Sequence, residues 1–183
     1  MHFDSTLRLD SARLVLSPIR ADDAPALFAI QSDPDVMRYW NHAPWTDLAQ
    51  AQAQIADDLA AMAVGTQLKL AIRDSAHGPL LGICVVFAID AASGRAEIGY
   101  NLAPQVQGKG YMREALTRLA TYLFDERGLR RLEAEIDPRN AASATVLERI
   151  GFQREGLLRE RWCIAGELSD SALYGLLARD RAA

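Results

Sequence analysis

The sequence has little cysteine: only Cys84 and Cys163 occur among its 183 residues. They lie far apart and lack the spacing of a metal-binding pair, so neither a disulfide scaffold nor a cysteine-based metal site is expected. Each lies in an apolar, strand-like run, which predicts that both are buried as small hydrophobic side chains. The low cysteine content fits a reducing cytoplasm, which is the expected location.

The sequence also lacks a long apolar run and an excess of positive charge. No stretch approaches the roughly 20 apolar residues that a membrane-spanning helix needs. Charged residues near the start, Asp4, Arg8 and Asp10, stand where a signal peptide requires an apolar core. The formal net charge of −4 argues against a broad basic surface for nucleic acid. We therefore expect neither a membrane nor a nucleic acid as a partner.

What is present is an ordinary globular composition. Half of the residues are hydrophobic and 24% are charged, as in typical globular domains. The length suits one domain with a substantial core, and no repeat or change of composition marks a boundary. The sequence therefore predicts a single domain over residues 1–183.

The spacing of apolar residues predicts the order of the secondary structure. Strands are expected over residues 13–20, 67–73, 80–89, 95–102, 130–136, 152–164 and 168–177. Helices are expected from Asp22 or Asp23 to Ser32, for one turn at 36–40, from a Thr46 cap to Val64, over 111–127, and from an Asn140 cap to Ile150. The three strands between 67 and 102 form an antiparallel meander. This order predicts a mixed α/β (α+β) domain with about seven strands and about four helices.

A glycine-containing stretch, Gln105-Val106-Gln107-Gly108-Lys109-Gly110, separates a predicted strand from a predicted helix. Two glycines at such a junction let the backbone approach a ligand closely. The first helical turn also offers unpaired N–H groups and the positive end of the helix dipole. By itself the stretch leaves two interpretations open, a phosphate cradle or a plain turn that uses glycine.

Four sequence motifs occur in a fixed order in the second half of the chain. They are Glu97-Ile98-Gly99-Tyr100, Gln105-x-x-Gly108-x-Gly110, Asp137-Pro138-x-Asn140-x-x-Ser143 and Gly151-Phe152. The first half of the chain adds two more motifs, Arg13-Leu14-x-Leu16-x-Pro18 and Asp33-Pro34-x-Val36-Met37. With these six motifs the chain resembles the GNAT superfamily of N-acetyltransferases over residues 11–178. Within it, the chain is similar to the branch that acetylates N-terminal amines of ribosomal proteins.

The resemblance implies a twisted mixed sheet whose fourth and fifth strands splay apart to admit acetyl-CoA. No metal is expected, because the histidines lack partners at metal-binding spacing. The resemblance further implies that backbone N–H groups of residues 106–111 hold the pyrophosphate of CoA. The cofactor-binding residues implied in this way are Tyr100, Asn101, Leu102, Gln105, Val106, Gln107, Gly108, Lys109, Gly110, Tyr111, Asn140 and Ser143. The alternative for Lys109 is a solvated side chain, and Asn140 also serves as a helix cap.

The resemblance also implies the two catalytic residues. Glu97 matches a carboxylate that accepts the amine proton through water; its alternative is a strand-edge glutamate paired with Arg95 or another surface cation. Most members place a tyrosine acid where this chain has Leu147. In the ribosomal-protein branch a serine at the position of Ser143 takes over as proton donor, and the alternative is a small residue for helix packing.

The acceptor is the least defined part of the prediction. Trp40 and Trp45, together with Glu97, are candidate substrate-binding residues, although aromatic residues near a proline also occur in plain core loops. The expected partner is an amine, either a protein N-terminus such as that of a ribosomal protein, or a small amine or amino acid. A homodimer is consistent with the resemblance.

Two rival functions follow from the same residues. The loss of the tyrosine at Leu147 is compatible with a catalytically inactive GNAT-like module that binds acyl-CoA or a partner protein. A nucleotide-binding P-loop fits poorly, because Tyr111 follows Gly110 where that motif requires lysine and a hydroxyl residue.

Overall fold

The computed structural model describes residues 3–181, and the first two and last two residues lie outside the described part. Eight strands form one mixed sheet in the order β1-β2-β3-β4-β5-β6-β8-β7. The strands are β1 (Leu9–Asp10), β2 (Val15–Pro18), β3 (Leu68–Arg73), β4 (Gly82–Asp90), β5 (Arg95–Leu102), β6 (Arg131–Ile136), β7 (Gln153–Ile164) and β8 (Glu167–Leu177). Neighbouring strands are antiparallel except β5 and β6, which are parallel.

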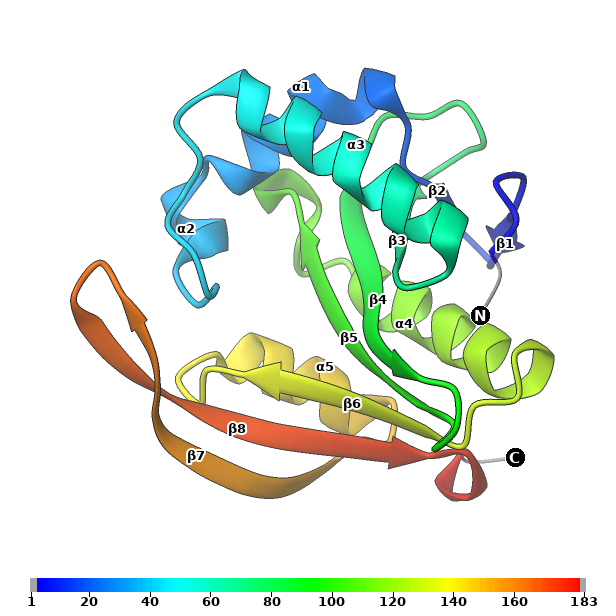
Figure 1. Cartoon of the computed structure of the whole chain (residues 1–183), viewed down its shortest axis with the longest axis vertical. Helices are drawn as coiled ribbons and strands as arrows, with labels where there is room; N and C mark the ends of the chain where they lie inside the picture. Colours follow the sequence, from blue (N-terminus) through cyan, green and yellow to red (C-terminus); the bar gives the residue numbers. More distant parts are fainter. Residues whose placement is uncertain (1–2, 182–183) are drawn as a thin grey trace.

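Five α-helices cover the two faces of the sheet (Figure 1). They are α1 (Ala24–Gln31), α2 (Pro34–Met37), α3 (Leu48–Val64), α4 (Tyr111–Thr121) and α5 (Ala141–Arg149). Helices α1 and α3 pack together over one face, whereas α4 and α5 lie behind the sheet on the other (Figure 1). This arrangement is the mixed twisted sheet that the sequence predicts.

The core lies on both sides of β2–β5. The largest side chains with almost no exposure are Leu9, Leu14, Leu16, Leu27, Ile55, Leu68, Leu70, Ile72, Ile83, Leu116, Leu119 and Leu123. Strands β3 and β4 supply residues to both faces, because neighbouring side chains of a strand point in opposite directions. The near-continuous apolar run of β4 is therefore explained by a layer of helices on each side.

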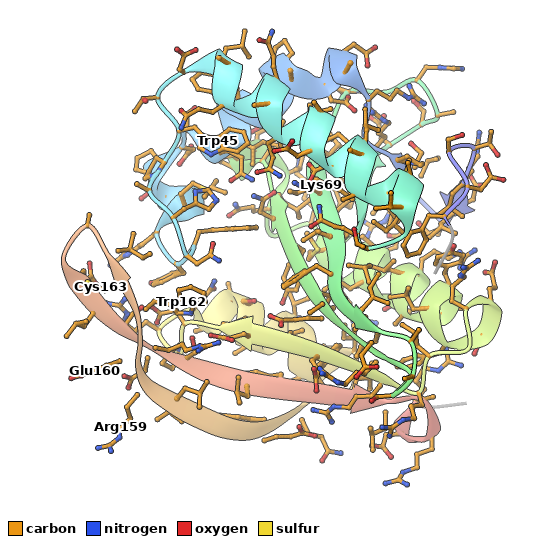
Figure 2. All side chains as sticks on the ribbon, in the orientation of Figure 1. Trp45, Lys69, Arg159, Glu160, Trp162 and Cys163 are labelled. Carbon is orange, nitrogen blue, oxygen red and sulfur yellow. The ribbon has the colours of Figure 1, made fainter. Side chains whose placement is uncertain are left out.

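Two buried ion pairs link the sheet to the helices on the α1–α3 side. Arg73 of β3 bonds both carboxylate oxygens of Asp23, which precedes α1, at 2.6 and 2.7 Å. Lys69 of β3 lies 2.6 Å from Asp58 of α3 (Figure 2). Charged groups this deeply buried require partners of opposite charge, so these pairs fix how α1 and α3 sit on the sheet.

The structure departs from the sequence prediction at several boundaries. Strand β1 has two residues, too few to show a period, and its pairing with β2 was not predicted. The N-cap of α3 is Asp47 rather than Thr46: its carboxylate accepts the Ala49 N–H at 2.8 Å, with Gln50 completing a capping box. The helix predicted over 111–127 changes at Tyr122 into a π-helical turn that ends at Glu126.

The two cysteines differ in burial. Cys84 on β4 is buried as expected, but the prediction for Cys163 is wrong, because this side chain is exposed. It lies near the tip of the β7–β8 hairpin, which extends beyond the helical layers (Figure 2). A strand at the edge of a sheet leaves an apolar-looking segment open to solvent. Within residues 3–181, no helix combines the length and apolar character needed to cross a membrane.

Candidate active site

Strands β5 and β6 are paired over only three residues. Arg95 pairs with Arg131, Ala96 with Leu132, and Glu97 with Glu133, after which the two strands separate. Figure 1 shows them together at one end and diverging toward the other. Residues 98–102 of β5 pair with β4 alone, so one edge of β5 presents backbone groups toward the opening. The splay that the resemblance implied between the fourth and fifth predicted strands is therefore present.

The glycine stretch connects the open end of β5 to α4. Gly108 and Gly110 have positive φ angles of 73° and 78°, which residues with a Cβ adopt only at a cost. Gly110 is the N-cap of α4, and no side chain caps that helix. The first backbone N–H groups of α4 are thus available to an anion.

Arg13, which precedes β2, holds this loop through direct contacts with its last residues and with α4. Its guanidinium donates to the Lys109 carbonyl at 3.0 Å and to the Glu114 carboxylate at 2.7 Å. It also stacks over the Tyr111 ring, 4.7 Å from the centroid. Sequence reasoning assigned no role to Arg13 or Glu114, although Arg13 opens one of the motifs that carried the resemblance. These contacts fix the end of the loop that leads into α4.

The other residues predicted to bind the cofactor lie along the same path. Gln107 donates its side-chain N–H to the Leu102 carbonyl at 3.1 Å, which ties the loop to the end of β5. Val106 is buried, whereas Gln105 and Lys109 are exposed. Asn101 is buried, and within residues 3–181 neither atom of its side-chain amide has a hydrogen-bond partner.

The N-terminus of α5 faces β5 across the opening. Asn140 is the N-cap, and its side-chain oxygen accepts the Ser143 N–H at 3.0 Å, as predicted. The Ser143 hydroxyl lies 2.7 Å from the hydroxyl of Tyr100 on β5. Leu147, one turn further along α5, is fully buried and has no proton to donate.

Glu97 lies on the opposite face of β5 from Tyr100. Residues opposite each other in antiparallel strands share a face of the sheet. Lys69 of β3 pairs with Val85 of β4, and Val85 pairs with Gly99 of β5. Because Lys69 bonds to Asp58 of α3, Gly99 faces the α1–α3 side. Glu97, two residues earlier on the strand, faces the same side. The two predicted catalytic residues therefore border the opening from opposite faces.

Carboxylates surround Glu97. Burial raises the pKa of Glu97, the nearby Glu135 and Glu133 carboxylates raise it further, and Arg161 and Arg95 lower it. Within residues 3–181 the structure shows no ion pair between Glu97 and Arg95, which instead bonds Glu133 at 2.8 Å. A half-buried carboxylate with a raised pKa has the character of a general base.

Glu135 is held in place from β7. Its Oε1 accepts the indole N–H of Trp162 at 2.8 Å, and Arg161 lies 3.3 Å from the same oxygen. Trp162 points from the hairpin toward β6 in Figure 2. Sequence reasoning missed Glu135 and Trp162, since nothing in the alternation of either strand marks them as a pair.

Trp40 and Trp45 lie in the connection between α2 and α3. His42 stands between them, with ring centroids 5.8 Å from Trp40 and 6.2 Å from Trp45. The Trp45 backbone N–H donates to the Gln31 carbonyl at 2.9 Å, which ties this segment to the end of α1. The structure therefore brings the two predicted tryptophans into one aromatic cluster.

Metal ligation finds no support in the described part of the chain. Within residues 3–181, no group of three or more His, Cys, Asp or Glu side chains is arranged to hold an ion.

Comparisons with known proteins agree with this geometry. The family model described as "Acetyltransferase (GNAT) domain" matches residues 13–153. The uncharacterized N-acetyltransferase p20 of Bacillus licheniformis is 36% identical over 176 residues, 95% of this chain and 98% of that protein. The ribosomal protein uS5-alanine N-acetyltransferase of Escherichia coli is 35% identical over 83 residues, 45% of this chain and 43% of that protein.

A solved structure extends the comparison of the fold. Spermidine N-acetyltransferase from Vibrio cholerae, in complex with CoA and spermine, superposes with a TM-score of 0.82 at 21% identity, covering 93% of this chain and 98% of that one. At this identity the likeness concerns the fold. The family match and the p20 relative carry the assignment: this chain belongs to the GNAT family and is an acetyltransferase.

Proposed function

We propose that the protein transfers an acetyl group directly from acetyl-CoA to a primary amine, without an acyl-enzyme. The observation that carries the proposal is the separation of β5 from β6 immediately after Glu97. Glu97, a carboxylate with a raised pKa, borders this opening on one face of β5, and the Ser143 hydroxyl borders it on the other. Acetyl transfer needs a group to remove the amine proton and a donor for the leaving thiolate.

Acetyl-CoA would lie along the open edge of β5, with its pyrophosphate at the start of α4. The support is the positive φ of Gly108 and Gly110 and the uncapped first turn of α4. A groove between residues 11–13 and α4 adds positive charge, since Arg13, Arg113 and Arg118 line it. These arginines and Lys109 are the candidate partners for the phosphates of CoA.

The chemical step assigns one role to each predicted catalytic residue. Glu97 accepts a proton from the attacking amine through a water molecule, and Ser143 returns a proton to the CoA thiolate. Backbone N–H groups on the free edge of β5 help to hold the thioester oxygen. Leu147 cannot act as the acid, and the resemblance to the ribosomal-protein branch supports the Ser143 hydroxyl in that role.

The acceptor is a primary amine that arrives as a cation. Glu97 is the candidate partner for such a group on the α1–α3 side of the opening, because Glu133 pairs with Arg95 and Arg131, and Glu135 with Arg161. A protein N-terminus is one candidate, since the uS5-alanine N-acetyltransferase is a relative of this chain. A small amine is the other, and the aromatic cluster of Trp40, His42 and Trp45 is the candidate wall of its pocket.

Thiol release from acetyl-CoA tests the proposal directly. The panel contains peptides that begin with alanine or serine, free amino acids, polyamines and aminoglycosides, and we expect turnover with at least one class. The identity of that class decides between a protein and a small-molecule acceptor. Tight binding of acetyl-CoA without turnover of any amine class would instead support a catalytically inactive acyl-CoA-binding module, the alternative suggested by Leu147 in place of a tyrosine.

A substitution of Gly110 tests the phosphate cradle. Gly110→Ala puts a side chain on a residue with φ of 78°, and we expect a loss of about 1–2 kcal/mol in stability and weaker binding of acetyl-CoA. Gly128→Ala is the matched control, because Gly128 has φ of 70° and open space around it at the end of the preceding helical segment. Equal calorimetric affinity for acetyl-CoA in the two variants would argue against the cradle.

A further inference from the structure

A short hydrogen bond joins two hydroxyl groups at the opening. Tyr100 extends from β5 toward α5, and its hydroxyl lies 2.7 Å from Ser143 Oγ. The residues are 43 positions apart, so the fold alone brings them together. Neither group is needed to cap α5, because the Asn140 side chain already accepts the Ser143 N–H.

The Ser143 hydroxyl differs from its neighbour on the same helix. Thr145 turns its hydroxyl back onto the Ala141 carbonyl four residues earlier, at 2.8 Å, which is the usual fate of a hydroxyl inside a helix. Within residues 3–181, the bond that the structure shows for Ser143 Oγ is the one to Tyr100. Ser143 is thus directed toward β5 rather than toward its own helix.

Either hydroxyl can donate in this bond, and we assign the donor role to the phenol of Tyr100. Burial raises the pKa of the Tyr100 phenol, so this group keeps its proton throughout the neutral range. A hydroxyl that accepts one hydrogen bond can still donate its own proton in another direction. With Tyr100 as donor, the Ser143 proton is free to point into the opening between β5 and β6.

A serine hydroxyl alone is a poor acid, because the alkoxide that remains is very unstable. A phenol hydroxyl next to it eases that difficulty, because its hydrogen bond stabilises the negative charge on the serine oxygen and its proton can move to that oxygen as the serine proton leaves. Leu147 occupies the position one turn beyond Ser143 and has no such group. The pair supplies from β5 the phenol that α5 lacks.

We propose that Tyr100 is a positioning residue for acetyl transfer, which donates to Ser143 Oγ and so directs the Ser143 proton at the sulfur of the leaving CoA. The inference rests on the proposed function. The carbon–sulfur bond breaks, and sulfur keeps the electron pair and takes the Ser143 proton. Ser143 takes the Tyr100 proton, and Tyr100 regains one from water. The amine proton leaves through Glu97, so the products are an amide and CoA thiol.

Steady-state kinetics of three variants tests this role. Ser143→Ala should lower kcat about 100-fold, in the range of general-acid effects, and Tyr100→Phe about tenfold, roughly the worth of one oriented hydrogen bond. The KM for acetyl-CoA should stay unchanged in both. In the Ser143→Ala background, Tyr100→Phe should cost nothing more, because Tyr100 acts through Ser143. Tyr122→Phe, which alters a buried tyrosine beyond α4, should keep wild-type kinetics.

A binding measurement gives a readout that does not depend on turnover. If Ser143 donates to sulfur, the affinity for free CoA should rise as pH passes about 8.5, where a free thiol ionises. Tyr100→Phe and Ser143→Ala should lose this rise. Desulfo-CoA, which lacks the sulfur, should bind the wild type and both variants alike at every pH.

Three results would overturn the role of Tyr100. The first is a kcat of Tyr100→Phe equal to that of the wild type. The second is an effect of Tyr100→Phe on the KM for acetyl-CoA alone. The third is a Tyr100→Phe substitution that lowers kcat as much in the Ser143→Ala background as in the wild type. A wild type that turns over no amine would refute the proposed function instead. In that case the binding series decides: a pH-dependent affinity for CoA that vanishes in Tyr100→Phe supports the pair, and a flat profile in the wild type excludes it.

Discussion

Glu97→Gln should lower kcat with the preferred amine by about 10²- to 10⁴-fold, the range that a positioned general base contributes. Glutamine keeps the size of the side chain and its hydrogen-bonding oxygen but cannot accept a proton. The half-buried site on β5 should therefore fold unchanged. Because Glu97 lies on the opposite face of β5 from the Tyr100–Ser143 pair, the KM for acetyl-CoA should change little. Initial rates with acetyl-CoA and the best amine of the panel measure the effect.

The pH dependence of the wild type should report the same residue. Glu97 acts as a base only when ionised, and burial together with Glu135 and Glu133 raises its pKa. The acid limb of kcat/KM should therefore fall at a higher pH than for an ordinary glutamate, with activity rising as pH increases through that pKa. In Glu97→Gln this limb should disappear.

Glu135→Gln is the matched control for the electrostatic part of the argument. The substitution removes one negative charge near Glu97 but keeps an oxygen that can accept the Trp162 N–H. With less repulsion the Glu97 carboxylate ionises more easily, so its pKa falls and the acid limb should move to lower pH. An acid limb that stays in place in Glu135→Gln and survives in Glu97→Gln would assign the base to another group.

The fold was largely predictable because its elements are amphipathic. The alternation over residues 67–73 corresponds to β3, and the helical spacing over 111–127 corresponds to α4 and the π-helical turn that follows it. What lacked a local signal was missed. Strand β1 has two residues, and it pairs with β2 because the chain reverses direction between them, not because of any alternation of apolar residues. Cys163 has the sequence context of a buried strand, but the place of β7 at the sheet edge leaves it exposed.

The site could be predicted only in part, for a related reason. Gly108 and Gly110 are informative because a single residue type reports a backbone requirement. Contacts between distant segments leave no such mark. Arg13 and Glu114 are separated by 101 positions, and Tyr100 was assigned to cofactor binding without any indication that its hydroxyl meets Ser143. Sequence motifs identified which residues matter, whereas their pairwise roles required the coordinates.

The second large effect concerns stability and lies away from the chemistry. Asp23→Ala should lower the free energy of unfolding by about 3–5 kcal/mol, the cost of leaving one member of a buried ion pair alone. Arg73 has 4% of its side chain exposed and Asp23 has 7%, so neither charge has water to compensate. The same carboxylate also accepts the Arg20 N–H at 2.8 Å, and that bond would be lost as well. Urea denaturation followed by circular dichroism measures the change.

Asp22→Ala is the matched control, because Asp22 is the exposed neighbour of Asp23 and should change stability by no more than about 0.5 kcal/mol. Replacing both charges, as in Asp23→Leu with Arg73→Met, should recover much of the loss, since the penalty comes from the unpaired guanidinium rather than from the missing attraction. Equal stability of Asp23→Ala and Asp22→Ala would contradict the importance of the pair. Arg73 also donates to the Gly78 carbonyl at 3.0 Å, so Arg73→Met alone should lower the free energy of unfolding too. Recovery of stability in the double variant separates the effect of the ion pair from the loss of that second contact.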